Sequence, residues 1–409
     1  MSNTLVTIDM VTREALRIAH EKCQFISTTD RQYDSSFAKT GAKIGASLRV
    51  RKPNQYLRTQ GTRVMDVQEQ DEQTSTVTVA TQDHVDMRFN SAELALSLDE
   101  LSKRYIEPAV SSLVSAIEGD YLAYATKKTY NVVGTAGTAI TDLTAPGLAR
   151  ARLNQMLAPK DRNRAIQMDS VTMAGLVKGV AAYFNPSGAI SEQYREGLVA
   201  RTSMADYYEN ERVWSLTNSA DVTVTTAAAA AVTDGGTNIT LASVGAGDTT
   251  AGMTFTVAGV YACHPETKQS LGYLQPYVVI TGGATTQTVS PATILTGPRQ
   301  NVCSAASAQL ATTAYNGTAV AVTFFGADST TYAQPLMYHK EAFQFVTADL
   351  PLMDDAHKCV RRSQDGLSLR VWQASDIRND ELLMRIDILY GMAALRPEWA
   401  CRMIGSASA

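Results

Sequence analysis

The hydrophobic positions along this chain repeat with two different periods. Over residues 97–130, apolar side chains recur at alternating steps of three and four, which is the spacing of one face of an α-helix. At 1.5 Å per residue, such a helix would be roughly 50 Å long. Proline lacks an N–H and clashes with the preceding turn, so Pro108 predicts a kink or a restart near Glu107. The residues predicted to form the buried stripe are Ile106, Val110, Leu113, Ile117, Tyr121 and Tyr124.

The two ends of this segment carry residues that helix termini favour. Ser97 and Glu100 have the spacing of a capping box, in which each side chain bonds the other residue's backbone N–H. Lys127 and Lys128 fall in the last turn, where cations interact well with the helix dipole. The pattern therefore predicts one long helix over 97–130.

A period of two precedes this helix and predicts a long two-stranded ribbon. Residues 47–53 and 75–90 alternate apolar and polar side chains, and a polar tip separates them. A two-stranded ribbon is marginal in water, so either the rest of the chain or another chain must support it. The charges at its tip fit a solvated hairpin, or complementarity between neighbouring subunits. On the second interpretation, the inter-subunit contact candidates are Arg49, Arg51, Arg58, Asp66, Glu69 and Asp71.

The flanking segments are shorter and more mixed. Residues 10–25 form an amphipathic segment, followed by a polar stretch that must stay mobile or lie on a partner. Behind the long helix, the pattern predicts helices over 145–157 and 170–183, with a buried strand at 165–168 between them. Residues 190–208 have short helical character, and a strand is predicted at 212–216.

The composition changes sharply near residue 220. From there to 332 the chain is rich in Thr, Gly, Val and Ala, and short β-prone runs alternate with turn signals. This spacing predicts a small barrel or sandwich inserted into an α/β body. After it, residues 342–353 are predicted to form a strand that leads to a loop, and residues 366–376 alternate as a strand does. A further strand of at least ten residues is predicted from Glu381, with its tail turning away after Arg396-Pro397. The long ribbon, the helix and these closing strands are expected to form one layer.

Composition excludes several classes of protein. With 36 Lys and Arg against 40 Asp and Glu in 409 residues, the net charge of −4 argues against a dedicated nucleic-acid binder. Five widely spaced cysteines without a C-x-x-C pair favour buried thiols in a reducing compartment. The N-terminus does not resemble a signal peptide, and no apolar run is long enough to span a membrane. These features predict a soluble protein made inside the cell.

Candidate chemistry is sparse. The five histidines are scattered, and no phosphate-binding loop, dinucleotide fingerprint or nucleophile elbow occurs. His357 and Cys359 would share one side of an extended strand, but two further metal ligands are not supplied nearby. We therefore expect no catalytic residues, no cofactor and no metal site.

Short motifs resemble a known family. The closing strand contains Tyr390-Gly391, Ala393 and Arg396-Pro397-Glu398, which resembles the C-terminal strand of tailed-phage major capsid proteins. The chain is most similar to the coat-protein family of short-tailed phages that carries an inserted β-barrel domain. The order of elements agrees over essentially the whole chain. Further matching points are Phe184-Asn185-Pro186, Ile190, Glu192, Arg195 and Gly197, and Gly252, Phe255 and Ala258-Gly259-Val260.

This resemblance implies an α+β fold of the Johnson type, shared by tailed-phage and herpesvirus capsids. Its expected parts are an N-terminal arm (1–40), an extended E-loop (41–96), the spine helix of a peripheral P-domain (97–130), an axial A-domain (131–219 and 333–362), an inserted β-barrel (220–332) and P-domain return strands (363–409).

The implied function is that of a major capsid protein of a tailed double-stranded DNA phage, assembled in the host cytoplasm and found in the virion. Its implied partners are further copies, in hexamers and pentamers, together with a scaffolding protein and a portal protein. Decoration proteins are left open, packaged DNA would be contacted only weakly, and no membrane is involved. Two alternatives remain from the residues alone: an α/β enzyme with a β accessory domain, and an adhesive or carbohydrate-binding surface protein.

Overall fold

The contacts of the chain separate into two units in the computed structural model. The first comprises Met1–Val50, Ser75–Leu122 and Phe343–Leu395, and the second comprises Arg51–Thr74, Ala123–Ala342 and Arg396–Ala409. Each unit is described by itself. The structure describes residues 8–31, 47–61, 65, 67–68, 72–90, 102–180, 205–219, 223–226, 234–242, 249–282, 286–308, 310, 320–352, 358–364, 366–376, 378 and 381–405.

Several predictions concern residues outside these ranges. They are the capping box at Ser97 and Glu100, the candidate metal ligand His357, and the family motifs at 184–186 and 190–197. Three of the charged ribbon residues, Asp66, Glu69 and Asp71, also lie outside these ranges.

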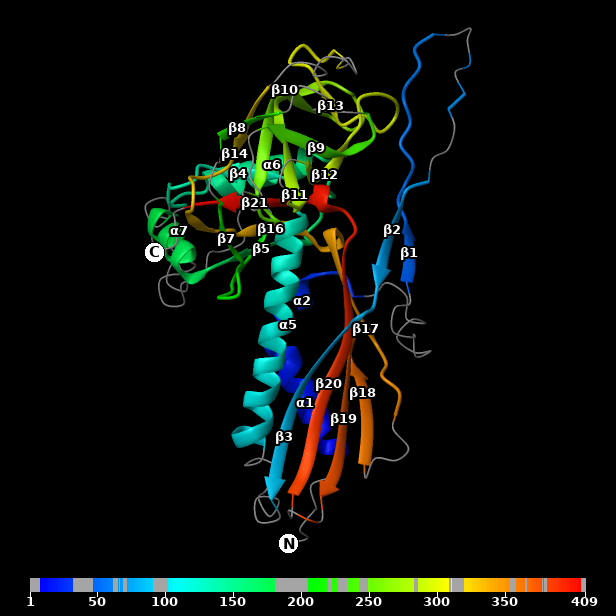
Figure 1. The fold of residues 1–409 in the computed structure, drawn as a ribbon, viewed down its shortest axis with the longest axis vertical. Helices are drawn as coiled ribbons and strands as arrows, with labels where there is room; N and C mark the ends of the chain where they lie inside the picture. The colour runs from blue at the N-terminus through cyan, green and yellow to red at the C-terminus, as the bar shows by residue number, and fades with distance from the viewer. Residues whose placement is uncertain are drawn as a thin grey trace. The chain divides into compact units, whose positions relative to one another are not determined.

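The first unit is built around the long strand β20 (Glu381–Ala394). Its first half pairs with β19 (Leu367–Asp376), its last residues pair with β17 (Phe343–Ala348), and β3 (Thr81–Asn90) pairs with residues 381–390. Strand β18 (Lys358–Gln364) extends the sheet beyond β19. All these pairings are antiparallel, and Figure 1 shows β3, β20, β19 and β18 running side by side.

Helix α5 (Glu107–Lys128) follows a π-helical turn, Ser102–Ile106. The regular α-helix therefore starts directly before Pro108, where the proline predicts a restart. Of the predicted stripe, five residues are buried and Tyr124 is partly buried. The Tyr121 ring lies 5.3 Å from the Phe345 ring of β17, measured between centroids, so α5 packs on the sheet through aromatic side chains.

Two N-terminal helices complete this unit. Helix α1 (Ile8–Lys22) lies against β18 and β19, and buries Val11, Ala15 and Ile18. The short helix α2 (Phe25–Thr28) places the Phe25 ring 4.7 Å from that of Tyr121. The amphipathic segment predicted over 10–25 is therefore two helices.

Strands β1 (Ser47–Arg51) and β2 (Thr74–Thr78) form the base of the predicted ribbon. Val50 and Val77 belong to a buried cluster with Val346 of β17 and Leu389 of β20, so the rest of the first unit supports this base. The second run of the ribbon was predicted as one strand over 75–90, but it is divided into β2 and β3 around residues 79–80.

The second unit contains a mixed sheet in the order β4-β21-β16-β5-β6. Strand β16 (Leu336–His339) is antiparallel to β5 (Arg164–Met168) and β21 (Ala400–Ile404). Strands β4 (Val132–Gly134) and β6 (Asp206–Glu209) are parallel to β21 and β5 respectively. Helix α6 (Thr144–Gln155) lies against β4, β16 and β21. The remaining elements are α7 (Ser170–Val180), the pair β7 (Ser215–Thr217) and β15 (Thr331–Ala333), and two 3-10 turns, Lys340–Ala342 and Pro397–Trp399.

One prediction in this region is wrong. The stretch up to residue 208 was assigned short helical character, whereas residues 206–209 form β6. Tyr207 points into the protein and is buried, and its strand pairs with the fully buried β5. Tertiary pairing with β5 thus overrides the local helical preference.

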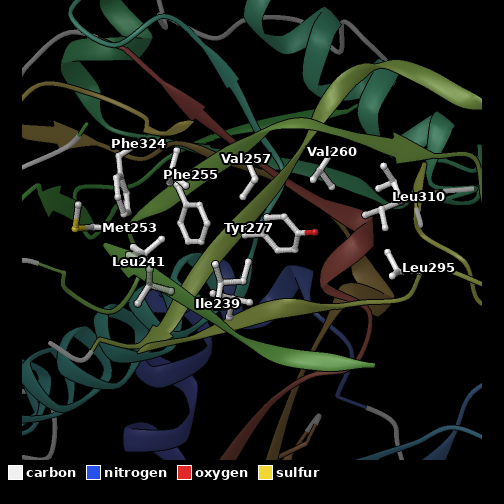
Figure 2. Close-up of a cluster of buried hydrophobic side chains, with 14 of the residues drawn as sticks. Ile239, Leu241, Met253, Phe255, Val257, Val260, Tyr277, Leu295, Leu310 and Phe324 are labelled. Atoms are coloured by element: carbon white, nitrogen blue, oxygen red, sulfur yellow. The ribbon is translucent and has the colours of Figure 1, made fainter. Parts of the chain in front are cut away.

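A seven-stranded antiparallel sheet fills much of the region between residues 223 and 324. Its order is β11-β12-β9-β8-β14-β10-β13, and β10 also pairs with β11, so the path of pairing closes on itself. Buried side chains from these strands, including Phe255, Tyr277 and Phe324, meet inside (Figure 2). The strands are β8 (Thr223–Thr226), β9 (Gly236–Ala242), β10 (Thr254–Cys263), β11 (Ser270–Thr281), β12 (Thr286–Thr293), β13 (Val302–Cys303) and β14 (Ala321–Phe324).

Candidate assembly surfaces and their supporting core

The tip of the ribbon exposes large apolar side chains. Met65 and Val67 are 85% and 78% exposed, and Tyr56 is 56% exposed. Isolated exposed hydrophobic residues are ordinary, but several on one narrow segment are typical of an interaction site. The described residues of this tip therefore form a candidate docking surface.

The two runs of the ribbon are joined mainly by polar contacts. The side chain of Gln68 accepts from the Leu57 N–H at 2.8 Å and donates to the Leu57 carbonyl oxygen at 2.6 Å. The Lys52 N–H donates to the Gln73 carbonyl oxygen at 2.8 Å. These contacts hold the two runs together, but they bury little apolar surface.

Three of the charged inter-subunit contact candidates lie within the described part of the ribbon. Arg51 forms an ion pair with Glu72 at 3.2 Å, but both side chains are mostly exposed, so this pair contributes little stability. Arg49 and Arg58 are exposed. The sequence-based prediction relied on these charges and did not single out Met65 and Val67, although both are apolar residues within an otherwise polar segment.

In the first unit, a buried carboxylate ties the N-terminal helices to α5. Glu118 is fully buried on α5, and its Oε1 accepts the backbone N–H groups of Gln24, at 2.8 Å, and Phe25. These amides lie at the start of α2, where the helix has no preceding turn whose carbonyl oxygens could accept them. The side chain therefore acts as a cap supplied from another helix.

A buried ion pair crosses the sheet of the same unit. Arg370 of β19 donates through Nε to Oδ1 of Asp387 at 3.0 Å and through Nη2 to Oδ2 at 2.5 Å. The carboxylate also accepts from Gln82 of β3 at 3.1 Å. Asp387 is fully buried, so this two-pronged arrangement fixes the register of β3, β20 and β19 more than it adds stability.

The Tyr390-Gly391 pair lies where β20 passes the ribbon base. The Tyr390 hydroxyl donates to Asp83 at 2.8 Å, and burial, together with this carboxylate, raises the pKa of Tyr390. A Cβ on Gly391 would lie 2.3 Å from the Thr78 carbonyl oxygen, so no larger residue fits without a backbone shift.

The second unit buries a guanidinium that has few partners. Arg402 of β21 is fully buried, and its Nη1 donates to the Gly252 carbonyl oxygen at 2.7 Å. Among the described residues, its Nε and Nη2 have no hydrogen-bond partner. Burial lowers the pKa of Arg402 to about 9.

A concave surface of the second unit lies beside α6. Its volume is about 490 Å³, and Arg152 of α6 stacks over the Tyr273 ring, with Cζ 3.0 Å from the ring centroid. Burial raises the pKa of Tyr273. The described residues of this lining include no carboxylate, so this surface suits apolar contact better than acid–base chemistry. It is formed by Val132, Val133, Gly134, Leu148, Ala151, Arg152, Gln155, Thr256, Tyr273, Leu274, Pro276 and Phe325.

The histidines and acids of the described residues do not gather into a catalytic or metal-binding group. Those residues contain no cluster of three or more His, Cys, Asp or Glu side chains able to hold a metal. His339 bonds Asp161 at 3.0 Å, and His264 Nδ1 accepts two backbone amides of its own turn. No helix in the described part of the chain is long and apolar enough to cross a bilayer.

Comparison with known proteins gives one family. A family model described as "P22 coat protein - gene protein 5" matches residues 67–405. A search of curated proteins finds no match.

Solved structures that match this chain include one from Mycobacterium phage Che8, at 8% identity and TM-score 0.47, covering 93% of this chain and 90% of that one. The capsid of Ralstonia phage GP4 is 8% identical with TM-score 0.44, covering 93% and 88%. The capsid structure of cyanophage P-SCSP1u is 10% identical with TM-score 0.43, covering 90% and 85%.

Proposed function

The chain belongs to the P22 coat protein family and is a major capsid protein of tailed phages, and we propose that its copies tile an icosahedral shell as hexamers and pentamers. The family match over residues 67–405 supports the function, which is structural and not enzymatic. The exposed apolar ribbon tip supports the proposed mode of association, because it needs a partner surface.

The single observation that carries the mode of association is the exposure of Met65 and Val67 on a ribbon with little apolar backing at its tip. Burying two such side chains on a neighbouring subunit would contribute roughly 3–6 kcal/mol before the costs of association. Closed symmetric assemblies repeat that contact once per copy, so a modest contact suffices to hold a shell together.

The parts of the chain take the roles expected of a Johnson-type capsid subunit. The ribbon is the E-loop, α5 is the spine helix, and the sheet around β20 belongs to the P-domain. The mixed sheet around β16 belongs to the A-domain. These boundaries differ from those expected from the sequence, since β21 is assigned to the A-domain, and β17 and β18 are assigned to the P-domain. The closed sheet of residues 223–324 is the inserted β-barrel, which stabilises the subunit and contacts neighbouring copies.

Further partners follow from the same role. A scaffolding protein directs assembly in the host cytoplasm, a portal protein occupies one vertex, and decoration proteins are a further candidate class. The packaged DNA is held weakly, because the chain carries a net charge of −4 and tight phosphate binding needs clustered Lys and Arg.

The test is assembly of the purified protein, followed by sedimentation velocity and negative-stain microscopy, with and without a co-expressed scaffolding protein. We expect large closed particles above a critical concentration and no consumption of any substrate. Strictly monomeric protein under all these conditions would overturn the proposal.

A further inference from the structure

Two cysteines meet on adjacent strands of the closed sheet. Strand β13 pairs antiparallel with the end of β10, with Cys303 opposite Tyr261 and Val302 opposite Ala262. Residues two apart on a strand point to the same face, so Cys263 lies on the same face as Tyr261, diagonally across from Cys303. The Cys263 N–H donates to the Asn301 carbonyl oxygen at 2.9 Å, which continues the ladder to the end of β10.

The two thiols are neighbours inside the protein. Each influences the pKa of the other, and the Ser270 side chain lies close enough to Cys303 to influence its pKa as well. Both residues are buried, at 2% and 0% exposure. Each sulfur lies 3.9 Å from a backbone carbonyl oxygen, that of His264 for Cys263 and that of Ala262 for Cys303.

The surroundings of Cys263 and Cys303 keep both thiols protonated in the folded protein, but a local opening would let them react. Burial raises the pKa of Cys263 to about 12 and raises that of Cys303, so both are thiols at neutral pH. The β10–β11 turn directly follows Cys263, and its Lys268 donates to the carbonyl oxygens of Pro298, at 2.5 Å, and Gln300, at 3.3 Å. Lys268 also favours the Cys263 thiolate by its charge. Opening this turn would expose both sulfurs together.

We propose that Cys263 and Cys303 form a reversible intramolecular disulfide that fastens β13 to β10 when the protein meets a low-molecular-weight disulfide outside a reducing compartment. One cysteine, as thiolate, attacks a sulfur of the small disulfide, which forms a mixed disulfide and releases one small thiol. The second cysteine then attacks the protein sulfur of that mixed disulfide and releases the other small thiol. The two cysteine protons pass to the leaving thiolates, so the protein is oxidised by two electrons and the reagent is reduced by two.

The crosslink would close the segment that contains β11 and β12. Closing a long loop restricts the unfolded chain and thereby stabilises the folded one. If the protein is a coat subunit, as proposed above, the bond would form after a particle leaves the host cytoplasm, and it would stiffen a shell already assembled. That timing depends on the proposed function, whereas the thiol chemistry does not.

The experiment uses the intact folded chain. The protein is incubated with 2-hydroxyethyl disulfide, quenched with an alkylating reagent, digested without reduction and analysed by mass spectrometry. We expect one crosslinked product joining the peptides of Cys263 and Cys303, lighter by two hydrogen atoms than the sum of the two peptides. Dithiothreitol should reverse it, and oxidised protein should unfold at a higher temperature than reduced protein.

Variants separate a specific pair from general thiol oxidation. C401S removes a buried cysteine of the second unit and should retain the crosslink in full. C303S should leave Cys263 only as free thiol or as a mixed disulfide with the reagent, and should lose the rise in unfolding temperature. The inference is overturned if native wild-type protein yields both cysteines alkylated, if Cys263 pairs with another cysteine, or if the crosslink forms only in denaturant.

Discussion

Two buried arginines of the second unit show how differently one residue type can be accommodated. Arg164 donates through Nε to the Pro159 carbonyl oxygen, at 3.0 Å, and through Nη2 to that of Ala158, at 2.9 Å. Both carbonyls lie just beyond the end of α6, where cations are favourable. Among the residues that the structure describes, the Arg402 side chain donates only to the Gly252 carbonyl oxygen, and burial lowers the pKa of Arg402. The first arginine organises a loop, and the second is a buried cation without a counter-charge among the described residues.

We predict that Arg402→Met raises the free energy of unfolding by about 1–2 kcal/mol at pH 7, because it removes a desolvated charge while filling most of the same volume. Burial lowers the pKa of Arg402 to about 9 in the folded chain, well below its ordinary value, so above pH 9 the unfolded chain binds more protons than the folded chain. Wild-type stability from this group therefore rises with pH above 9. The advantage of the variant should be full below pH 9 and should shrink as the pH increases.

Urea denaturation of both proteins at several pH values measures this difference. Arg164→Met is the matched control, and it should lower stability, because it leaves two carbonyl oxygens without their donor. A loss of stability in Arg402→Met comparable to that in the control would show that the Gly252 contact outweighs the burial of charge.

The burial of apolar residues is easier to predict from sequence than the burial of charged ones. The apolar stripe from Ile106 to Tyr121 follows from periodicity, and these residues are buried. Asp387 and Arg402, by contrast, are charged residues in strands, and a charge in a strand is typical of a solvent-facing position. Their burial depends on neighbours that are 150 or more residues away in the sequence, such as Gln82 for Asp387 and Gly252 for Arg402.

At the scale of elements, the docking of the N-terminal helices depends on one side chain of α5. We predict that Glu118→Ala removes the carboxylate that accepts the backbone N–H groups of Gln24 and Phe25, at a cost of about 1–3 kcal/mol. Because α2 has only four residues, it cannot compensate by its own hydrogen bonds. Hydrogen exchange should therefore accelerate in residues 23–28, while β19 and β20 retain their protection.

Asp120→Ala is the control for this prediction, since Asp120 is exposed on the same helix. It should leave exchange in residues 23–28 unchanged. Equal acceleration in both variants would mean that helix propensity or net charge, and not the cap on α2, controls the N-terminal segment.

The length of an element decides how well sequence predicts it. Helix α5, β19 and β20 are long enough for their periodicity to be read directly, and Pro108 marks where the α-helix begins. The five-residue strand β5 was predicted, but the short strands β4, β16 and β21 were not. They are defined by pairing between distant parts of the chain, for example Met337 with Ile166 and Cys401, and no local pattern reveals such partners.

At the scale of the whole molecule, the ribbon separates the folding of a subunit from its assembly. The base residues Val50 and Val77 belong to the core of the first unit, whereas the described residues of the tip are mostly exposed and are joined by polar contacts. We predict that replacing residues 56–73 by a short Gly-Ser turn leaves the free energy of unfolding within about 1 kcal/mol of wild type. The same change should abolish or strongly reduce shells in sedimentation and microscopy.

A finer variant tests which atoms of the tip matter. The double substitution Met65→Ser and Val67→Ser removes two exposed apolar side chains without shortening the ribbon, so it should raise the critical concentration for assembly at least tenfold, corresponding to about 1.4 kcal/mol per contact. Gln60→Ala, also on the exposed ribbon, should assemble as wild type does. If the replacement of residues 56–73 abolished the cooperative unfolding of the isolated subunit, this result would show that the tip is part of the core. If the double variant assembled normally, the charged residues Arg49, Arg51 and Arg58 would become the better candidates for the contact.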